Sequence, residues 1–382
     1  MSLGYSWIEI DSRRLHRNAA HFRKILGVGT KLMAVVKANA YGHGAGLVAP
    51  LLRSDVDWFG VDSLEEAEEL SSKGISEPIL IMGHTEPADA ERVLAGDFRQ
   101  VLFRRDVAEA LSSAAKGQNK RARVHLKVET GLNRLGVEPR GVAALVEGLD
   151  GLEIEGIYTH FADVEDPEST FYRKQIERLR EAVAIVGGDR LVHALPTAGT
   201  LLHAESSLAI ARVGIGLYGI WPSPSTRRAA EGQGSLAPVL TWKTRLAQVK
   251  TVPAGGSVGY DVTYRAPSER RIAVVPVGYS DGYDRRLSNR GRVLMRGRSA
   301  PVVGRVAMNM FMVDVTEANA REGDEVVLLG EQDGAAITAE DLAESIGTIA
   351  YEVLARLSPR LQRRLRQPAD EGEVGGRPIE SR

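Results

Sequence analysis

Residues 31–44 read KLMAVVKANAYGHG, an apolar run typical of a buried strand that delivers Lys37 to the start of a turn-rich segment. Burial of a lysine at the end of a strand disfavours its charged form, which lowers its pKa and frees the amine to attack a carbonyl carbon. Lys37 is therefore a candidate for forming a Schiff base. Taken alone, the pattern more often marks a surface lysine after a core strand, so the rest of the chain has to decide.

Strand-like runs alternate with amphipathic helical stretches over about the first 220 residues. Eight runs are predicted as strands: 31–38, 58–63, 78–83, 99–103, 122–130, 152–162, 191–197 and 209–216. They are continuously apolar, as in parallel sheets that are covered on both faces, so eight βα units favour a closed (β/α)8 barrel of the TIM type. A doubly wound sheet is the competitor, but no GxGxxG follows the first strand.

The pattern changes near residue 235. Beyond the loop PSPSTRRAAEGQGS, β-rich runs are separated by glycine and proline turns, with one or two later helices. We therefore expect an α/β chain with a barrel domain over 1–235, a mainly β domain over 236–367 and a disordered polar tail over 368–382.

The composition excludes several classes of function. The 382 residues carry a formal net charge of −1, which gives no global field for nucleic acid or an anionic membrane. Cysteine is absent, so disulfides and thiolate zinc sites are excluded, and a reducing cytoplasm is the expected location. The eight histidines lack HExxH-type spacing, so no metal site is expected. No signal-peptide core and no run of 18 apolar residues occurs.

Polar residues gather at the ends of the predicted barrel strands, where the active site of such a barrel lies. They are Lys37, Lys127, Arg134, His160, Thr197 and Arg212. The segment VGIGLYG (213–219) then offers backbone N–H groups to a phosphate, and the residues that could surround it are Tyr41, Thr197, Gly214 and Ile215. A phosphate site beside a Schiff-base lysine suggests pyridoxal 5′-phosphate (PLP).

Eight segments in this order carry a resemblance to a known family: AVVKANAYGHG (34–44), VHLKVETGLNRLGVE (124–138), EGIYTHFAD (155–163), ARVGIGLYGI (211–220), SVGYDVTY (257–264), VGYSDGY (277–283), VGRVAMNMFMVDV (303–315) and AYEVLARL (350–357). Together they resemble the bacterial alanine racemases, fold-type III PLP enzymes, over about residues 5–365. The resemblance implies a homodimeric isomerase that interconverts L- and D-alanine and supplies D-alanine for peptidoglycan.

The resemblance also implies roles for individual residues. Lys37 matches the PLP-binding lysine and the base for the D-isomer, and Tyr260 matches the base for the L-isomer, supplied by the partner subunit. Implied contacts with the substrate are Arg134, Met308 (again from the partner subunit) and Tyr279, which lines the entrance. Implied contacts with the cofactor are Tyr41, Thr197, Gly214, Ile215 and Tyr351 at the phosphate, and Arg212 at the pyridine nitrogen with His160 linking it towards Tyr260. Lys127 matches a lysine that is often carbamylated.

Three departures from the family pattern leave the substrate open. Pro196, Asn309 and Ala350 stand where Asn, Asp and Asn are usual, so racemisation of serine, lysine or another amino acid is the alternative function. A fold-type III decarboxylase would use a cysteine in the second domain, which this chain lacks. A PLP carrier built from the barrel alone would have no use for the domain that bears Tyr260.

Overall fold

The computed structural model describes residues 4–204 and 208–366, and these form two compact units. One unit comprises residues 13–238. The other combines the described residues up to Ser12 with those from Val239 onward. The tail that the sequence predicts over 368–382 lies outside the described residues.

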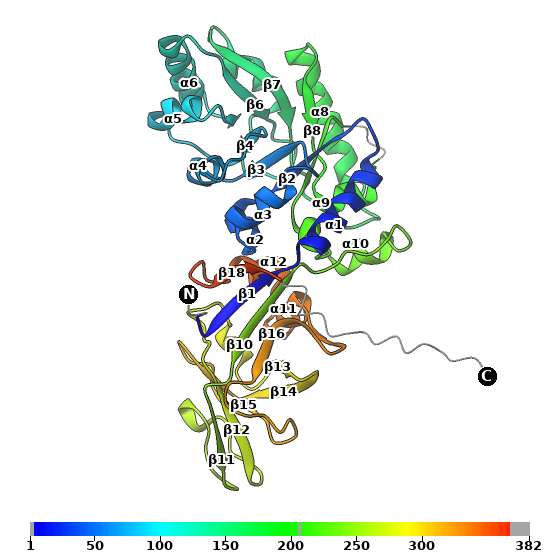
Figure 1. Cartoon of the computed structure of the whole chain (residues 1–382). Coiled ribbons are helices and arrows are strands. Elements are labelled where there is room, and N and C mark those ends of the chain that lie inside the picture. The colour runs from blue at the N-terminus through cyan, green and yellow to red at the C-terminus, as the bar shows by residue number, and fades with distance from the viewer. Residues whose placement is uncertain (1–3, 205–207, 367–382) are drawn as a thin grey trace, which may run out of the picture. The chain divides into compact units, whose positions relative to one another are not determined.

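The first unit is a closed barrel of eight parallel strands (Figure 1). In chain order around the barrel these are β2 (Lys31–Val35), β3 (Trp58–Val61), β4 (Ile79–Ile81), β5 (Arg99–Leu102), β6 (Ala122–Lys127), β7 (Leu152–Tyr158), β8 (Leu191–His193) and β9 (Ile210–Val213). Pairing of Met33 with Arg212 helps to close β2 onto β9. The predicted barrel is confirmed. Each strand ends earlier than predicted, because its last predicted residues, apolar as well as polar, already belong to the connection that follows it.

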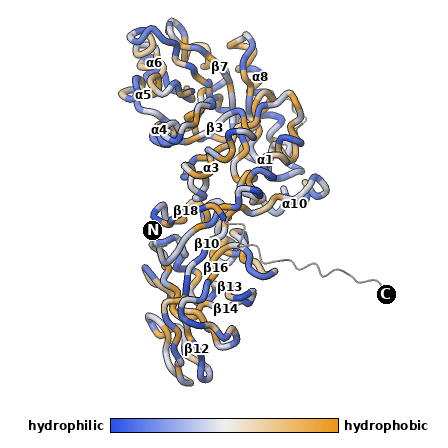
Figure 2. The backbone as a smooth tube through the Cα atoms, in the orientation of Figure 1, coloured by the Kyte–Doolittle hydropathy of each residue, from blue (hydrophilic) through white to orange (hydrophobic). Residues whose placement is uncertain are grey.

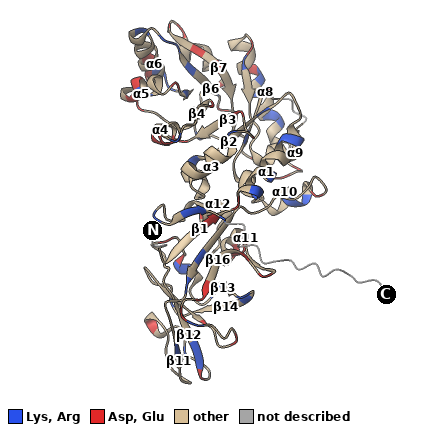
Figure 3. Ribbon diagram, in the orientation of Figure 1, with Lys and Arg blue, Asp and Glu red and all other residues tan. Residues whose placement is uncertain are grey.

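Helices cover the outside of the barrel. The helices are α1 (Ser12–Leu26), α2 (Lys37–Tyr41), α3 (Ala45–Leu52), α4 (Leu64–Ser72), α5 (Ala90–Ala95), α6 (Arg105–Gln118), α7 (Val142–Val146), α8 (Phe171–Val186), α9 (Thr197–Leu202) and α10 (Pro224–Ala229), with 3₁₀ turns η1 (Pro87–Asp89), η2 (Pro139–Gly141) and η4 (Ile215–Tyr218). In α1, the buried residues Leu15, Ala19 and Phe22 share one face at helical spacing. Acidic and basic residues are interspersed on the outer helices (Figure 3).

The second unit is built on one mainly antiparallel sheet, in the order β11-β12-β15-β14-β13-β16-β10-β1-β18, with β17 paired to β16. Its elements are β1 (Ser6–Ile10), β10 (Leu240–Arg245), β11 (Gln248–Val252), β12 (Arg270–Val275), β13 (Arg292–Met295), β14 (Arg298–Val303), β15 (Phe311–Asp314), β16 (Glu325–Gln332), β17 (Ala335–Ile337), β18 (Gln362–Leu365), α11 (Ala339–Ile346), α12 (Ala350–Ala355), η5 (Tyr260–Val262) and η6 (Arg285–Leu287). Figure 2 shows the apolar stretches along β16 and, in the barrel unit, along α3. No helix in the described ranges is long and apolar enough to cross a membrane.

Strand β1 belongs to the sheet of the second unit, whereas the sequence placed residues 1–12 in the barrel domain. It pairs with β10 and with β18, and the Glu9 side chain, 1% exposed, fixes all three strands. Glu9 accepts hydrogen bonds from Trp7 Nε1 at 2.9 Å and from Arg364, and its second oxygen lies 3.0 Å from Lys243 Nζ. These partners lie more than 200 residues along the chain from Glu9, except Trp7, so no local pattern announces the pairing.

Candidate active site

The barrel brings the polar residues of the predicted site to one end. Lys37 follows β2, Lys127 ends β6, Arg212 lies in β9 and His160 follows β7. Because the carboxyl ends of parallel barrel strands meet at one rim, these side chains share one mouth. The charges also indicate that the side chains are close together, because burial is joined by the positive charges of Arg134, Arg212 and Lys37 in lowering the pKa of Lys127. The predicted barrel residues therefore form one cluster.

Lys37 begins a single left-handed turn. Residues 38–41 all have positive φ, between 52° and 54°. Such a conformation costs L-residues roughly 1–2 kcal/mol each, so its surroundings have to hold it. Gly42 closes the turn by donating its N–H to the Ala38 carbonyl at 3.0 Å. Because these residues directly follow Lys37, their fixed conformation also fixes the position of the Lys37 backbone, from which the side chain extends.

Glu66 on α4 holds the lysine turn against the next strand. One carboxylate oxygen accepts the Ala38 N–H at 2.6 Å, and the other accepts the Asp62 N–H at 2.8 Å. The Asp62 carboxylate in turn lies 3.6 Å from Lys37 Nζ. The sequence signal for Glu66 was the spacing Ser63-x-x-Glu66 of a helix cap, and Ser63 does accept the Glu66 N–H. The Glu66 carboxylate, however, does not bond back to the start of its own helix; it accepts the N–H groups of Ala38 and Asp62.

Substitution Glu66→Ala tests this role. It removes two charge-assisted but solvent-open hydrogen bonds, so we expect the free energy of unfolding to fall by about 1–2 kcal/mol. If PLP binds at Lys37, as the sequence suggests, the protein should also retain it less tightly, because the turn that begins at Lys37 loses the hydrogen bond from Ala38 to Glu66. Chemical denaturation and release of PLP on dialysis measure the two effects. Glu65→Ala is the matched control, since the exposed Glu65 makes only a 3.7 Å ion pair with Arg92. Equal behaviour of the two variants would contradict the role of Glu66.

A narrow cradle lies where the glycine-rich segment follows β9. The Gly214 N–H donates to Thr197 Oγ1 at 3.1 Å. A Cβ on Gly214 would stand 2.5 Å from the Tyr41 hydroxyl oxygen, so a larger residue there would displace Tyr41. Burial, and then the charge of Asp62, raise the pKa of Tyr41 to about 12, which keeps its hydroxyl a neutral donor. Together with Ile215, which follows directly, these groups suit a phosphate.

The cradle and the lysine turn are packed together through Tyr218 on η4. Its hydroxyl donates to the Val35 carbonyl at 3.0 Å, at the end of β2. Its ring stacks on His43 with centroids 4.3 Å apart, and the His43 ring lies against the Ala40 carbonyl. The two predicted parts of a cofactor site are therefore one rigid piece of the barrel mouth.

Arg212 is buried and makes four polar contacts. Its NH2 group donates to the carbonyls of Thr159 at 2.9 Å and Ala194 at 3.1 Å and lies 3.2 Å from His160 Nδ1, while NH1 lies 2.9 Å from His193 Nδ1. Burial lowers the pKa of Arg212 to about 10, so the guanidinium remains charged at neutral pH. Burial and the nearby cations hold the pKa of His160 well below its ordinary value. His160 is therefore neutral, and the positive charge here comes from Arg212.

Two residues that the sequence analysis missed position this mouth. Glu129 accepts the backbone N–H groups of Gly131 and, at 3.3 Å, of Arg134, and so shapes the loop that bears Arg134. Gln175, fully buried on α8, donates to Thr130 Oγ1 at 3.0 Å and to the His160 carbonyl at 3.2 Å. A lone amide on the apolar face of α8 was the available signal for Gln175.

The remaining predicted residues lie in the second unit. Tyr260 begins η5 and is 67% exposed, and Met308 and Tyr279 are also exposed. These three residues line one groove of about 860 Å³. The loops that carry Tyr279 and Met308 are joined by a 3.1 Å bond from the Tyr279 N–H to the Ala307 carbonyl. Tyr351 lies apart from this groove, on α12.

The departures at Asn309 and Pro196 have clear structural settings. Asn309 Nδ2 donates to Ser280 Oγ at 3.0 Å, and Ser280 Oγ donates to the Met308 carbonyl at 2.8 Å. Asn309 thus supports the backbone around Met308 with an uncharged group. Pro196 precedes Thr197 at the start of α9, and its carbonyl accepts the Thr200 N–H at 2.8 Å. The hydroxyl of Thr197 remains available to the cradle.

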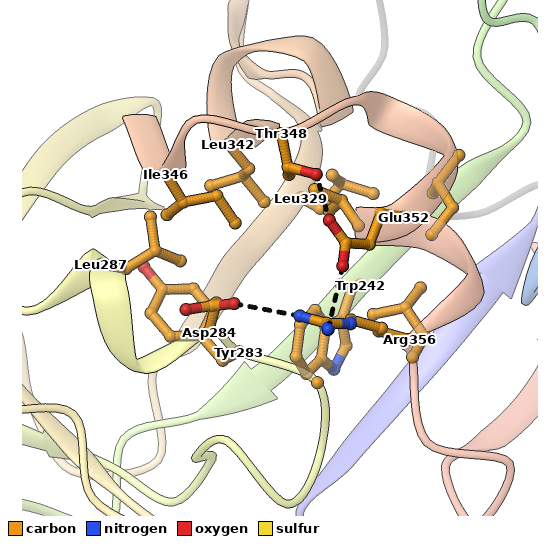
Figure 4. Close-up of a pocket in the computed structure, with 14 residues that line it drawn as sticks. Trp242, Tyr283, Asp284, Leu287, Leu329, Leu342, Ile346, Thr348, Glu352 and Arg356 are labelled. Atoms are coloured by element: carbon orange, nitrogen blue, oxygen red, sulfur yellow. Dashed lines mark hydrogen bonds and ion pairs between the residues drawn. The ribbon is translucent and has the colours of Figure 1, made fainter. Parts of the chain in front are cut away.

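A second, enclosed cavity in the same unit lies between α12 and the loop after β12 (Figure 4). Its rim carries an ion-pair chain in which Arg356 lies 3.5 Å from Asp284 and 2.9 Å from Glu352. The volume, about 20 Å³, admits a water molecule but no amino acid. The cavity is therefore too small for an amino acid, whereas the open groove at Tyr260 has room for one.

Comparison with known proteins agrees with this geometry. Residues 10–222 match the family described as "Alanine racemase, N-terminal domain", and residues 239–365 match "Alanine racemase, C-terminal domain". The alanine racemase of Symbiobacterium thermophilum is 43% identical over 367 residues, which cover 94% of this chain and 96% of that protein.

Solved structures are similar over nearly the whole chain. The alanine racemase of Bacillus anthracis with bound L-Ala-P has a TM-score of 0.90 and 32% identity, covering 97% of each chain. That of Bartonella henselae, with covalently bound pyridoxal phosphate, has a TM-score of 0.84 and 26% identity, covering 95% of this chain and 99% of that one. No relative described here supports the alternative substrates. Since both family matches together span both units, the chain belongs to the alanine racemase family.

Proposed function

We propose that this chain, a PLP-dependent alanine racemase, moves the α-proton of alanine with two bases, Lys37 and Tyr260. The observation that carries the proposal is the single cluster at the barrel mouth, in which the amine of Lys37, the polar groups around Gly214 and the Arg212 guanidinium lie together. Tyr260 lines an open groove, and it would supply the second base from the partner subunit.

The residues of the mouth fit PLP. Lys37 would bind the aldehyde carbon, Tyr41, Thr197, Gly214 and Ile215 would hold the phosphate, and Arg212 would face the ring nitrogen. The close approach of the Tyr41 hydroxyl to Gly214 places a side-chain donor beside the backbone N–H groups of the glycine-rich segment, where both could contact a phosphate. When bound, PLP withdraws electrons from the α-carbon and so makes its proton removable. We assign Tyr351 to the phosphate as well, on the family resemblance alone.

Racemisation needs a proton taken from one face of the α-carbon and another delivered to the opposite face. Lys37 would serve the D-isomer and Tyr260 the L-isomer, while Arg134 binds the substrate carboxylate and Met308 and Tyr279 bound the entrance. A phenol ionises in water only near pH ~10, so a tyrosine base needs positive charge close by. Neutral His160 would link Arg212 to Tyr260 by hydrogen bonds, so that the positive charge of Arg212 favours the ionised form of the Tyr260 phenol.

The site would be completed by a second copy of the chain. Tyr260 is 67% exposed, and the groove around it also exposes Met308, Met310 and Tyr279. An exposed apolar groove of this kind marks an interaction surface. We propose a homodimer in which each groove closes the barrel mouth of the partner. In this homodimer the amino-acid substrate would bind between the barrel mouth of one chain and the groove of the other.

Lys127 is the candidate for carbamylation. Burial first, and then the charges of Arg134, Arg212 and Lys37, lower the pKa of Lys127 to about 8 from 10.5. The neutral amine, which is the form that reacts with carbon dioxide, is therefore far more abundant near neutral pH than in an ordinary lysine. The reaction of the amine with carbon dioxide forms an anionic carbamate and releases a proton. The carbamate would relieve the crowding of cations and could accept hydrogen bonds from Arg134.

Carbon-13 NMR of the protein in ¹³C-bicarbonate tests this modification. We expect a carbamate signal that strengthens as the pH rises towards 8, because protonation of Lys127 competes with the reaction at lower pH. The signal should be missing from Lys127→Arg, which keeps the positive charge. A signal that persists in this variant would belong to another amine and would contradict the assignment.

Proton NMR of the PLP-loaded protein in D2O tests the reaction itself. With L-alanine we expect loss of the α-proton signal and the appearance of D-alanine on chiral analysis. L-serine and L-lysine, run in parallel, should exchange more slowly. Faster exchange with either would move the assignment to another amino acid. Failure of all three to exchange, with PLP bound, would contradict the function.

A further inference from the structure

A row of buried polar side chains leads away from Arg212 through the interior of the barrel. Arg212 NH1 lies 2.9 Å from His193 Nδ1 on β8, and His193 Nε2 lies 2.8 Å from His125 Nδ1 on β6. His125 Nε2 lies 3.4 Å from a carboxylate oxygen of Glu155 on β7. Arg99 on β5 donates to the same oxygen at 3.1 Å. Both histidines are fully buried, and the reaction described above uses neither.

The hydrogen atoms of this row can be placed in one way. A guanidinium only donates, so His193 Nδ1 must accept and carries no proton. The proton of neutral His193 is then on Nε2, which donates to His125 Nδ1. His125 in turn carries its proton on Nε2, facing the Glu155 carboxylate. At 3.4 Å this last contact is an interaction of charge with a dipole rather than a well-formed hydrogen bond.

The other protonation states are excluded by the geometry. The reverse tautomer of His193 would set its Nδ1–H against the N–H of Arg212 at 2.9 Å. A doubly protonated His193 would do the same and add a second buried positive charge. In keeping with this, burial and the charge of Arg212 hold the pKa of His193 well below its ordinary value. Burial likewise lowers the pKa of His125. All donors therefore point from Arg212 towards Glu155.

Two local features of β7 accommodate the row. The pairing of β6 with β7 shifts register between Val124 and His125, so that Glu155 is the extra residue of a β-bulge. A bulge re-aims the side chain it carries. The next residue, Gly156, faces the imidazole so closely that a Cβ would lie 2.4 Å from His125 Nδ1. The backbone thus makes room for His125 and turns Glu155 towards it.

We propose that His125, backed by Glu155, is a remote positioning residue for Arg212. The proposal rests on the proposed function, in which Arg212 faces the ring nitrogen of PLP. By accepting the Nε2 proton of His193, His125 stabilises the tautomer and ring orientation that the contact with Arg212 requires, and so keeps NH1 of Arg212 engaged inside the barrel. His125 on β6 would thereby influence the environment of the PLP ring nitrogen through His193 and Arg212. His125 itself touches neither substrate nor cofactor.

Substitutions at His125 separate hydrogen bonding from packing. Glutamine can still accept from His193 through its carbonyl oxygen and donate to Glu155 through its amide, whereas leucine can do neither. We expect His125→Leu to lower kcat by about 10-fold, the scale of losses on removing an outer hydrogen-bond partner, with the KM for alanine nearly unchanged. It should also shift the visible absorption band of the bound PLP. His125→Gln should restore both the band and most of kcat.

Nitrogen NMR of the wild-type, histidine-labelled, PLP-loaded protein tests the row without any substitution. We expect both His193 and His125 to carry their proton on Nε2 with Nδ1 bare. Tyr158→Phe is the matched control. The Tyr158 ring stacks on His193 at 4.6 Å, but its hydroxyl has no hydrogen-bond partner among the described residues, so the tautomers should not change.

The outcomes distinguish this inference from the proposed function. Inactive wild-type protein would overturn the proposed function, while the nitrogen spectrum would still report the tautomers. Active wild-type protein with His193 protonated on Nδ1 would overturn the inference alone. Equal losses in His125→Leu and His125→Gln would show that shape matters and not hydrogen bonding, which also overturns it. If His125→Leu does not fold, the nitrogen spectrum and His125→Gln decide the matter.

Discussion

Substitution Tyr260→Phe should lower kcat for racemisation by about 10²–10⁴-fold in both directions, the range that a positioned acid–base group contributes. The two isomers should nevertheless differ in α-proton exchange. Under the proposed mechanism, Lys37 can still remove the proton of D-alanine and return a solvent deuteron to the same face. L-alanine requires the missing phenol. In D2O, D-alanine should therefore exchange without inversion while L-alanine hardly exchanges, as proton NMR with chiral analysis would show.

The fold should survive this change. Tyr260 is 67% exposed, so removal of its hydroxyl leaves no buried group unpaired. The control is Tyr264→Phe in the same segment, because Tyr264 packs against the cluster of Val258, Ile272 and Val303 and is not among the residues that line the groove. It should keep full activity. Exchange of L-alanine in Tyr260→Phe at the wild-type rate would show that another group is the second base.

The sequence predicted the barrel because its strands announce themselves locally. Continuously apolar runs such as β2 and β3 are buried, and a candidate site residue follows or ends several of the runs, as Lys37 does after β2 and Lys127 at the end of β6. Sequence motifs therefore predicted most of the candidate residues at the barrel mouth. Strand β1 was misplaced for the opposite reason, since its partners in β10 and β18 are remote in the chain.

What the sequence could not give is the support behind the motifs. The left-handed turn at residues 38–41 contains alanines, which have no preference for positive φ, so nothing in their identity predicts it. Glu66 holds that turn from another βα unit. The row from Arg212 to Glu155 joins four strands that are distant in sequence, and its direction follows only from the order of donors and acceptors. Such features are set by tertiary contacts rather than by periodicity.

Substitution Lys37→Ala should abolish racemisation, by about 10³-fold or more, because under the proposed mechanism it removes both the covalent attachment of PLP and one of the two bases. Its most informative use is in mixtures with Tyr260→Phe. If each site combines Lys37 of one chain with Tyr260 of the other, a mixed dimer has one site with both residues intact and one with neither. Equal amounts that exchange freely give half mixed dimers, hence about one quarter of wild-type activity.

The same mixture discriminates against a site completed within one chain. There, every barrel that keeps Lys37 would be served by the phenylalanine of its own chain, which cannot act as a base, and activity would not recover. Lys37→Ala mixed with Arg134→Ala is the matched control, because both changes lie in the barrel and neither mixed site can be whole. Activity measured after exchange, with mixed dimers counted by native mass spectrometry, gives the result per dimer. Recovery in the first mixture and none in the control would establish that the groove at Tyr260 closes the barrel mouth of a second chain.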